Sequence, residues 1–268
     1  RFYDDIEPVS VIEDLIKISS PQENERVIFI WPEGILPEIS KNQLQEYKWL
    51  FENKFNENHI LAIGINDVTK QDQVKKYFNS FSIYDHNLEI INSYKKVNLV
   101  PFGEFLPFEK ILRQIGLKNL TNNYQSYSRG EKRNIIEINK FDFSIKLLPL
   151  ICYEIIYSGN IFDDRNFDFI VNISEDGWFG QSIGPQQHFA HTIYRAIESG
   201  KYILRSANNG IAAIVNPLGV VEKQVDLDQF GYVDFIESKK IKPTIFSKYG
   251  NKIFGLMILL YILLIYSF

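Results

Sequence analysis

Short apolar runs recur along most of the chain, and clusters of polar residues, glycine and proline separate them. The length of these runs and their content of β-branched and aromatic residues predict buried strands. The predicted strands are Val27–Trp31, Ile60–Ile65, Ser80–Tyr84, Leu88–Tyr94, Ser144–Ile151, Phe169–Ile173, Tyr202–Arg205, Ile211–Val215 and Val220–Val225. Turn residues at 85–87 and 216–219 predict hairpins between neighbouring strands.

Two stretches repeat their apolar residues at helical spacing instead. Lys41–Phe55 and Gln186–Ser199 are predicted helices, and Gly200 is placed to cap the end of the second one. The first ten residues, RFYDDIEPVS, read as the beginning of a further helix. Many strands with interspersed helices predict an α/β fold.

The end of the chain has a different pattern, because residues 253–268 contain no charge over 16 positions. A spanning helix needs about 20 apolar residues, and flanking residues such as Tyr249 and Lys252 can extend a shorter one. The alternative is a buried core helix, but no later segment follows to cover its apolar circumference. We therefore predict one domain over residues 1–245 and a transmembrane segment over residues 246–268.

Composition narrows the class of protein. Hydrophobic residues make up 45% of the chain and charged residues 23%, which excludes a disordered chain. The net charge of −4 and the scattered lysines give no basic face, so we expect no nucleic-acid partner. The single cysteine, Cys152, excludes an intramolecular disulfide.

Candidate chemistry lies where two predicted strands end and in a third stretch between them. Cys152 closes the run KLLPLI, Glu33 follows the run VIFIWP, and Lys96 and Glu104 flank an apolar stretch with a proline and a glycine. Taken singly, a lone cysteine is more often structural, and each charged residue is more often a solvated surface group. Together they predict that an acid, a lysine and a thiol meet at one edge of one sheet. Glu33 would accept the thiol proton, and Lys96 would stabilise the thiolate and then an oxyanion.

The motifs WPE (31–33), KxxLVPFGE (96–104) and CYE (152–154), in that order, resemble the Glu-Lys-Cys triad of the nitrilase superfamily. The stretches LVPFGEFLP, ICYEI and 172–219 are similar to those of one family within it, the apolipoprotein N-acyltransferases of bacterial membranes. This resemblance covers residues 27–225 and continues to the final hydrophobic segment. It implies a nitrilase-like α-β-β-α sandwich followed by one C-terminal transmembrane helix.

The resemblance also implies roles for individual residues. Glu33 is the expected general base, Lys96 the oxyanion-stabilising lysine and Cys152 the acylated nucleophile. The expected supporting residues are Glu104, which orients the lysine, Tyr153 and Glu154, which serve the second half-reaction, and Asn79, which lies near the site. Trp178 is expected to border the entrance, with a packed core tryptophan as the alternative. His188 and His191 share a helix face but lack a third ligand, so we expect no metal.

The implied reaction is a two-step acyl transfer without a cofactor. Cys152 takes the acyl chain of a phospholipid as a thioester, and the amine of an apolipoprotein's diacylglyceryl-cysteine then takes it as an amide. The implied partners are therefore the phospholipid donor, the diacylglyceryl-apolipoprotein acceptor and the membrane. The implied location is the bacterial inner membrane, with the catalytic domain on the periplasmic side. The lysines before the last helix predict the opposite side by the positive-inside rule; they are Lys239, Lys240, Lys242, Lys248 and Lys252.

Two departures from the family pattern keep other functions open. The family carries membrane helices before the catalytic domain, which this sequence does not contain, and the domain is expected to lack its usual first strand. One alternative is an amidase that uses the same triad and hydrolyses a small amide. The other is a catalytically silent, membrane-associated remnant.

Overall fold

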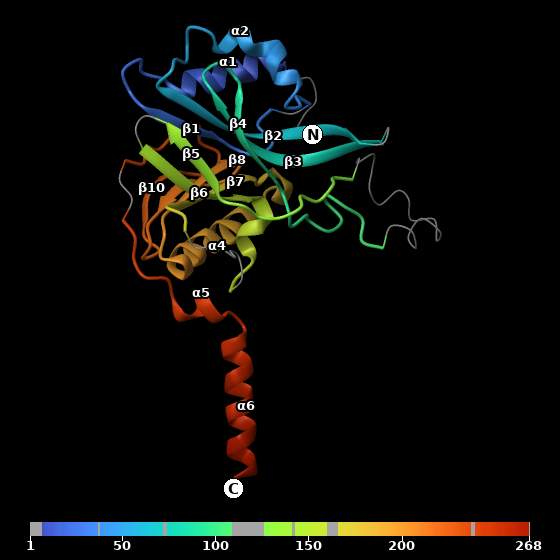
Figure 1. Ribbon diagram of the computed structural model, residues 1–268, viewed down its shortest axis with the longest axis vertical. Coiled ribbons are helices and arrows are strands. Elements are labelled where there is room, and N and C mark those ends of the chain that lie inside the picture. Colours follow the sequence, from blue (N-terminus) through green and yellow to red (C-terminus); the bar gives the residue numbers. More distant parts are fainter. Residues whose placement is uncertain are drawn as a thin grey trace.

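Two sheets packed face to face form the body of the protein (Figure 1). The computed structural model describes residues 7–36, 38–71, 74–108, 126–140, 143–159, 166–236 and 239–267. The first six residues of the predicted N-terminal helix and Phe268 of the predicted membrane segment lie outside this part of the chain.

The first sheet has four strands in the order β1-β2-β3-β4. Strand β1 (Val27–Trp31) runs parallel to β2 (His59–Gln71). Strands β3 (Val74–Asp85) and β4 (Ile90–Lys95) continue the sheet in antiparallel pairs. The predicted turn at 85–87 joins β3 to β4, as expected for a hairpin.

The second sheet has six strands in the order β10-β9-β8-β7-β6-β5. Its central strands are parallel, and every residue of β7 is buried, as is typical of a strand covered on both faces. The outer strands pair antiparallel. The strands are β5 (Ile136–Lys140), β6 (Phe143–Ile151), β7 (Phe169–Glu175), β8 (Ile203–Asn208), β9 (Ala212–Val215) and β10 (Val221–Val225).

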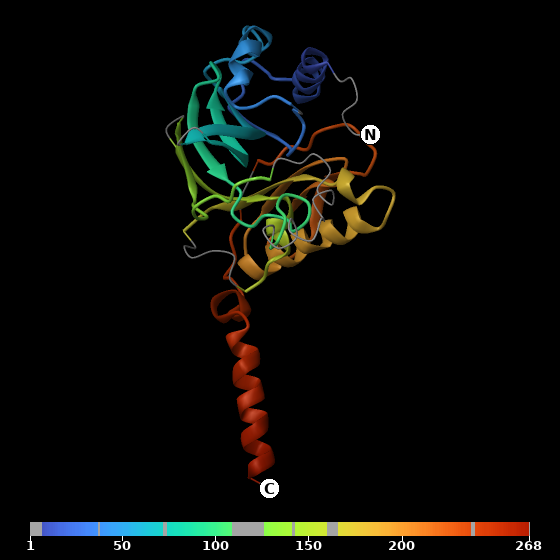
Figure 2. The same cartoon turned by 90° about the vertical axis from the view of Figure 1, so that its right-hand side faces the viewer.

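Helices cover the outer face of each sheet (Figures 1 and 2). Helix α1 (Pro8–Ser19), the 3-10 helix η1 (Gln43–Tyr47) and α2 (Lys48–Phe51) pack on the first sheet. Helix α4 (Gly184–Ser199) packs on the second. Residues from both sheets share a third buried cluster between them. The predicted α/β fold with an α-β-β-α order is therefore confirmed.

Most predicted elements match an observed one, but one helix is confirmed only in part and one observed strand was not predicted. The helix predicted over Lys41–Phe55 is confirmed only in part: the segment forms η1 and the one-turn α2, and Asn53 adopts a left-handed conformation (φ 63°) soon after α2 ends. Apolar spacing does not distinguish a 3-10 turn from an α-helix over so few residues. Strand β5 was not predicted. The predicted helix with Gly200 as its cap is confirmed, with the glycine at φ 65°.

The transmembrane segment predicted at 246–268 is not supported by the structure. Gly250 (φ 54°) interrupts it and separates α5 (Ile245–Tyr249) from α6 (Lys252–Tyr266). The 15 residues of α6 fall short of the roughly 20 that cross a bilayer. Within the described residues, no helix combines the length and the apolar composition that crossing a membrane requires.

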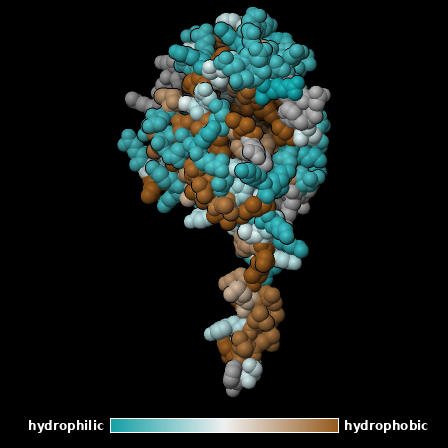
Figure 3. All heavy atoms as spheres, turned by 90° about the vertical axis from the view of Figure 1, so that its left-hand side faces the viewer, coloured by the Kyte–Doolittle hydropathy of each residue, from teal (hydrophilic) through white to brown (hydrophobic). Residues whose placement is uncertain are grey.

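Helix α6 projects away from the sandwich and exposes apolar side chains around its circumference (Figure 3). None of its described residues is buried, so the alternative prediction of a core helix is also wrong. Helix α5 instead rests on the sandwich, where the Thr244 hydroxyl donates to the Glu198 carbonyl at 3.2 Å. Gly250 lies directly against Gly159, so a side chain at either glycine would collide with the other.

Candidate active site

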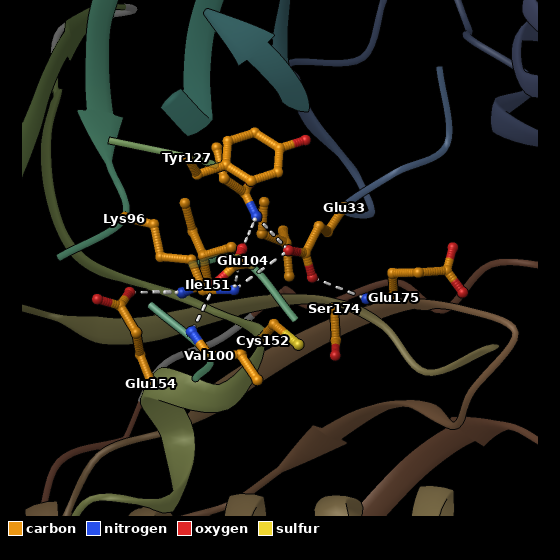
Figure 4. A network of polar contacts seen from close by, with 12 residues as sticks. Glu33, Lys96, Val100, Glu104, Tyr127, Ile151, Cys152, Glu154, Ser174 and Glu175 are labelled. Atoms are coloured by element: carbon orange, nitrogen blue, oxygen red, sulfur yellow. Dashed lines mark hydrogen bonds and ion pairs between the residues drawn. The ribbon is translucent and has the colours of Figure 1, made fainter. Parts of the chain in front are cut away.

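The ends of strands from both sheets converge at one end of the seam between them (Figure 4). Glu33 lies two residues beyond β1, and Lys96 follows β4 directly. Cys152 follows β6 and opens the 3-10 helix η3 (Cys152–Ile156). The acid, the lysine and the thiol therefore meet as predicted, but between two sheets and not at the edge of one.

Lys96 is the central cation of this cluster. Its side chain is 1% exposed, and its Nζ lies 2.9 Å from Glu104 Oε1 and 3.4 Å from Glu33 Oε1. Burial by itself lowers the pKa of Lys96, but the carboxylates of Glu33 and Glu104 outweigh burial and raise it overall. The lysine is therefore a fixed positive charge at neutral pH.

Asn79 and the backbone of β7 hold the carboxylate of Glu33 in place. Asn79 Nδ2 donates to Glu33 Oε1 at 2.5 Å and to Glu104 Oε1 at 2.9 Å. The backbone N–H of Glu175 donates to Glu33 Oε2 at 2.9 Å. Both oxygens of Glu33 thus have donors, which fixes the orientation of the carboxylate before any substrate arrives.

Gly64 permits the chain that carries Glu33 to lie close against β2. A Cβ at position 64 would lie 2.6 Å from the Pro32 carbonyl oxygen and 2.7 Å from Glu33 Cα. No side chain is accommodated at such distances without a shift of the backbone. The sequence therefore needs glycine here in order to place Glu33.

Cys152 adopts a left-handed backbone conformation with φ 50°, which is costly for a residue other than glycine. Burial and the charge of Glu33 raise the pKa of its thiol to about 12, although Lys96 and a hydrogen bond with Ser174 act in the opposite direction. The residue keeps partial solvent exposure. The resting group is therefore a neutral thiol that needs a base at the moment of attack.

Glu104 lies where the resemblance predicts it, beside the lysine. Its Oε1 accepts from Lys96 and Asn79, and its Oε2 accepts from the Val100 backbone N–H at 2.8 Å. Glu104 therefore links the loop after β4 to the charged cluster.

Glu154 is fully buried and ties the loop after β4 to the strand that carries the nucleophile. Its Oε1 accepts from Tyr94 Oη at 2.8 Å and from the backbone N–H groups of Val97 and Asn98 at 3.0 Å. Its Oε2 accepts from the Ile151 backbone N–H at 2.9 Å. With its lone pairs satisfied in this way, Glu154 acts as a structural anchor directly beside Cys152.

Tyr153 and Trp178 lie nearer the surface. The Tyr153 ring packs edge-on against Tyr157, with 5.9 Å between their centroids. Trp178 lies in η4 (Gly177–Phe179), directly after the polar end of β7, and its side chain is 61% exposed. The packed core tryptophan considered as an alternative is therefore excluded, and a place at the entrance stays a prediction.

Sequence reasoning missed Glu175, a residue that is 5% exposed. Gly177 N–H and Asn209 Nδ2 donate to its Oε1, and Asn208 Nδ2 donates to its Oε2. Burial raises its pKa to about 7, with a smaller contribution from Glu33 in the same direction. The signal for Glu175 was an acid at the end of a strand that begins with three apolar residues.

A second missed group surrounds Asp176, the residue directly after β7. Asp176 accepts from Ser174 Oγ at 2.7 Å and from Arg205 Nη2 at 2.7 Å, and it pairs with His188 Nδ1 at 2.9 Å. Burial would raise the pKa of Asp176, but His188 and Arg205 hold it below its usual range. Across the described part of the chain, no group of three or more histidine, cysteine or acidic residues could hold a metal ion.

Comparison with known proteins identifies relatives of this chain. The family model of the carbon-nitrogen hydrolases matches residues 10–234. The chain is 36% identical over 244 residues to the apolipoprotein N-acyltransferase of Rickettsia typhi, covering 89% of this chain and 47% of the relative. It is 34% identical over 232 residues to the enzyme of the same name from Rhizobium leguminosarum, covering 84% and 43%. The chain thus spans about half the length of these curated relatives.

Solved structures with the same fold have much lower sequence identity. An amidase from Nesterenkonia sp. AN1, with an acetamide group on its active-site cysteine, matches with a TM-score of 0.54 and 13% identity over 82% of this chain and 80% of the amidase. Saccharomyces cerevisiae Nit3, a nitrilase-superfamily member, matches with a TM-score of 0.56 and 16% identity, again over 82% and 80%. These likenesses show the fold.

Proposed function

Because the chain belongs to the carbon-nitrogen hydrolase family, we propose that it transfers acyl groups through a thioester on Cys152. Its proposed donor is a phospholipid, and its proposed acceptor is the N-terminal amine of a diacylglyceryl-apolipoprotein. The names of the relatives support this choice of substrates. The observation that carries the chemistry is the lysine held between two carboxylates beside a strained thiol.

In the first half-reaction, Glu33 accepts the proton of the Cys152 thiol while the sulfur attacks the ester carbonyl. The carbonyl oxygen becomes an oxyanion, and the fixed charge of Lys96 stabilises it. The ester C–O bond then breaks, and the protonated Glu33 returns the proton to the departing alkoxide. A lysophospholipid leaves, and the thioester and the ionised Glu33 remain.

In the second half-reaction, the neutral amine attacks the thioester carbonyl and Glu33 accepts one of its protons. Lys96 again stabilises the oxyanion. The C–S bond breaks as the amide forms, and Glu33 returns the proton to the sulfur. The donor contacts from Asn79 and Glu175 hold the same carboxylate ready for both steps.

We propose that α6 associates with a lipid surface and so brings the site to its substrates. Its apolar side chains are exposed over most of their area; Leu260 is 52% exposed, Leu263 57% and Leu264 59%. Exposed apolar surface of this extent favours contact with an apolar partner. The location that follows is the bacterial inner membrane, with the periplasmic side as the family expectation.

The test of the function uses the single cysteine. Protein incubated with a phospholipid of defined acyl chain should gain the mass of one acyl group, and neutral hydroxylamine should remove it. Cys152→Ser and Glu33→Gln should each abolish this labelling. Hydroxylamine-sensitive labelling that persists in Cys152→Ser would exclude a Cys152 thioester.

Acceptor choice then separates the three functions predicted from the sequence. The proposed transferase keeps its thioester until a diacylglyceryl peptide amine is added, and it then releases the acyl chain as an amide. Turnover of short amides with no accumulated thioester would instead indicate an amidase. A folded protein with a free Cys152 thiol that forms no thioester with the phospholipid and does not turn over short amides would be a silent remnant.

A further inference from the structure

The backbone of Cys152 needs support because its left-handed conformation is unfavourable. Side chains hold it from both sides. On the N-terminal side, Glu154 accepts from the Ile151 backbone N–H. On the C-terminal side, Nε2 of His188 lies 3.2 Å from the Cys152 carbonyl oxygen.

His188 connects that carbonyl to the buried Asp176. Its ring is 4% exposed, and its Nδ1 lies 2.9 Å from Asp176 Oδ1. The same Oδ1 accepts from Ser174 Oγ, and Ser174 hydrogen-bonds the Cys152 thiol. Asp176 is therefore joined to Cys152 twice, through Ser174 to the sulfur and through His188 to the carbonyl.

Both ring nitrogens of His188 face oxygens that accept hydrogen bonds. The Cys152 carbonyl oxygen can only accept, so the contact at 3.2 Å is a hydrogen bond in which Nε2–H of His188 donates. The charged groups that face the ring are Asp176 and Arg205, whose Nη2 lies 3.3 Å from Nδ1 and 2.7 Å from Asp176 Oδ2.

We propose that His188 is a positioning residue that holds the strained peptide of Cys152 and so directs the sulfur toward Lys96 and Glu33. Glu154 accepts from the backbone N–H of the preceding residue, Ile151, whereas His188 contacts the backbone carbonyl of Cys152 itself. This inference rests on the proposed role of Cys152 as the nucleophile. A purely structural alternative is that His188 serves only to pin α4 to Asp176.

Two amide substitutions separate these roles, because each places an amide nitrogen near the position of one nitrogen of the original ring. His188→Gln places an amide N–H near Nε2 and retains the contact with the Cys152 carbonyl. His188→Asn places one near Nδ1 and retains the contact with Asp176. A positioning role therefore predicts that His188→Gln keeps most of the reactivity of the thiol and that His188→Asn loses it.

The readout is the rate at which iodoacetamide alkylates Cys152, followed by mass, together with the melting temperature of each variant. Alkylation needs an oriented and accessible thiolate but no acyl transfer, so it stays informative even if the phospholipid labelling fails. We expect alkylation about tenfold slower in His188→Asn and nearly unchanged in His188→Gln. Equal rates in the two variants, or a slower rate in His188→Gln, would overturn the proposal.

A second measurement uses the unmodified protein, in case a variant does not fold. Nitrogen NMR of histidine-labelled protein should show a proton on Nε2 of His188, the nitrogen that faces the Cys152 carbonyl. The signals are assigned by their loss in either variant that folds or by contacts to Phe179, whose ring lies 5.6 Å away. An Nε2 without a proton would overturn the hydrogen bond that the proposal requires.

Discussion

Two regions depart from the usual pattern of buried apolar and exposed charged residues, and they do so in opposite directions. One is the seam between the two sheets, and the other is helix α6. At the seam, charged groups are buried: Lys96 is 1% exposed and Glu33 is 8% exposed. On α6, leucines and isoleucines are exposed. Buried charge is tolerated at the seam because opposite charges and amide donors surround it. The apolar surface of α6 has no comparable partner among the described residues, since none of them buries it.

This difference teaches where function resides. A buried ionic cluster costs free energy that an apolar core would not. Such clusters are nevertheless frequent at catalytic sites, because catalysis needs groups whose pKa values are shifted by burial and by neighbouring charges. An exposed apolar helix costs free energy until it meets an apolar surface. Chemistry is therefore expected at the seam and contact with lipid at α6, and each expectation can be tested without disturbing the other.

Lys96→Met should have the largest effect, because it leaves Glu33 and Glu104 buried without their cation. Breaking a buried pair in this way costs about 3 kcal/mol of unfolding free energy, and thioester formation should fall below detection. Lys95→Met is the matched control, since Lys95 is a partly exposed neighbour that pairs with Asp67 at 3.2 Å. Its effect in denaturant titration should stay below about 1 kcal/mol. Equal losses in the two variants would remove the distinction between the seam and the surface.

Glu33→Gln should separate the base from the charge at the seam. The negative charge of Glu33 contributes to raising the pKa of Cys152 to about 12, so its removal lowers that pKa. The thiolate fraction then increases, and alkylation of Cys152 at about pH 9 should become faster than in the unmodified protein. Acylation by phospholipid should nevertheless disappear, because no base remains. Slower alkylation in Glu33→Gln would contradict the assigned sign of the charge effect.

Gly64→Ala should have an intermediate effect, because the added methyl group would collide with the backbone that carries Glu33. We expect a loss of about 1–3 kcal/mol and a reduced rate of acylation. Gly255→Ala in α6 is the control, since a Cβ there has no atom within 4 Å. That change should leave both the domain and its activity unaltered. A harmless Gly64→Ala would show that the position of Glu33 tolerates displacement.

Polar substitutions on α6 should have the smallest effect on the folded domain. Leu260→Gln with Leu264→Gln should change the unfolding free energy by no more than about 0.5 kcal/mol, because both side chains are exposed. Binding to phospholipid vesicles should weaken at least about tenfold, since the gain from burying two leucines in lipid is lost. Leu218→Gln changes another exposed leucine, on the turn between β9 and β10, and should leave vesicle binding unchanged.

The sequence predicted the parts of the fold that a local pattern determines. Apolar runs located the strands, two of their ends located Glu33 and Cys152, and the motif around residues 96–104 located Lys96. Strand β5 was missed although Ile136 and Ile138 are buried and alternate with the exposed Glu137, because five residues make a weak pattern. Which sheet each strand joins depends on pairing between distant segments. The three groups were therefore predicted at the edge of one sheet, whereas they lie between two.

The network around Asp176 could not be predicted for a different reason. Its members come from the end of β7, from α4 and from β8, and each is unremarkable where it stands in the sequence. His188 was considered only as a metal ligand, and the sequence does not show that its two nitrogens face Asp176 and the Cys152 carbonyl. These contacts form only when β7, α4 and β8 have packed together and have buried their charged side chains.

The division of the site between two sheets also orders its assembly during synthesis. Glu33, Asn79, Lys96 and Glu104 all leave the ribosome before Cys152, and every strand of the first sheet precedes every strand of the second. The hydrogen bond from Glu175 to Glu33 joins residues 142 positions apart. The first sheet can therefore pair its strands while its lysine and carboxylates are still hydrated, and the cluster loses its water only when the second sheet docks. The nucleophile reaches its partners as one of the last events of folding, so a nascent chain carries no competent thiol until the whole sandwich has closed.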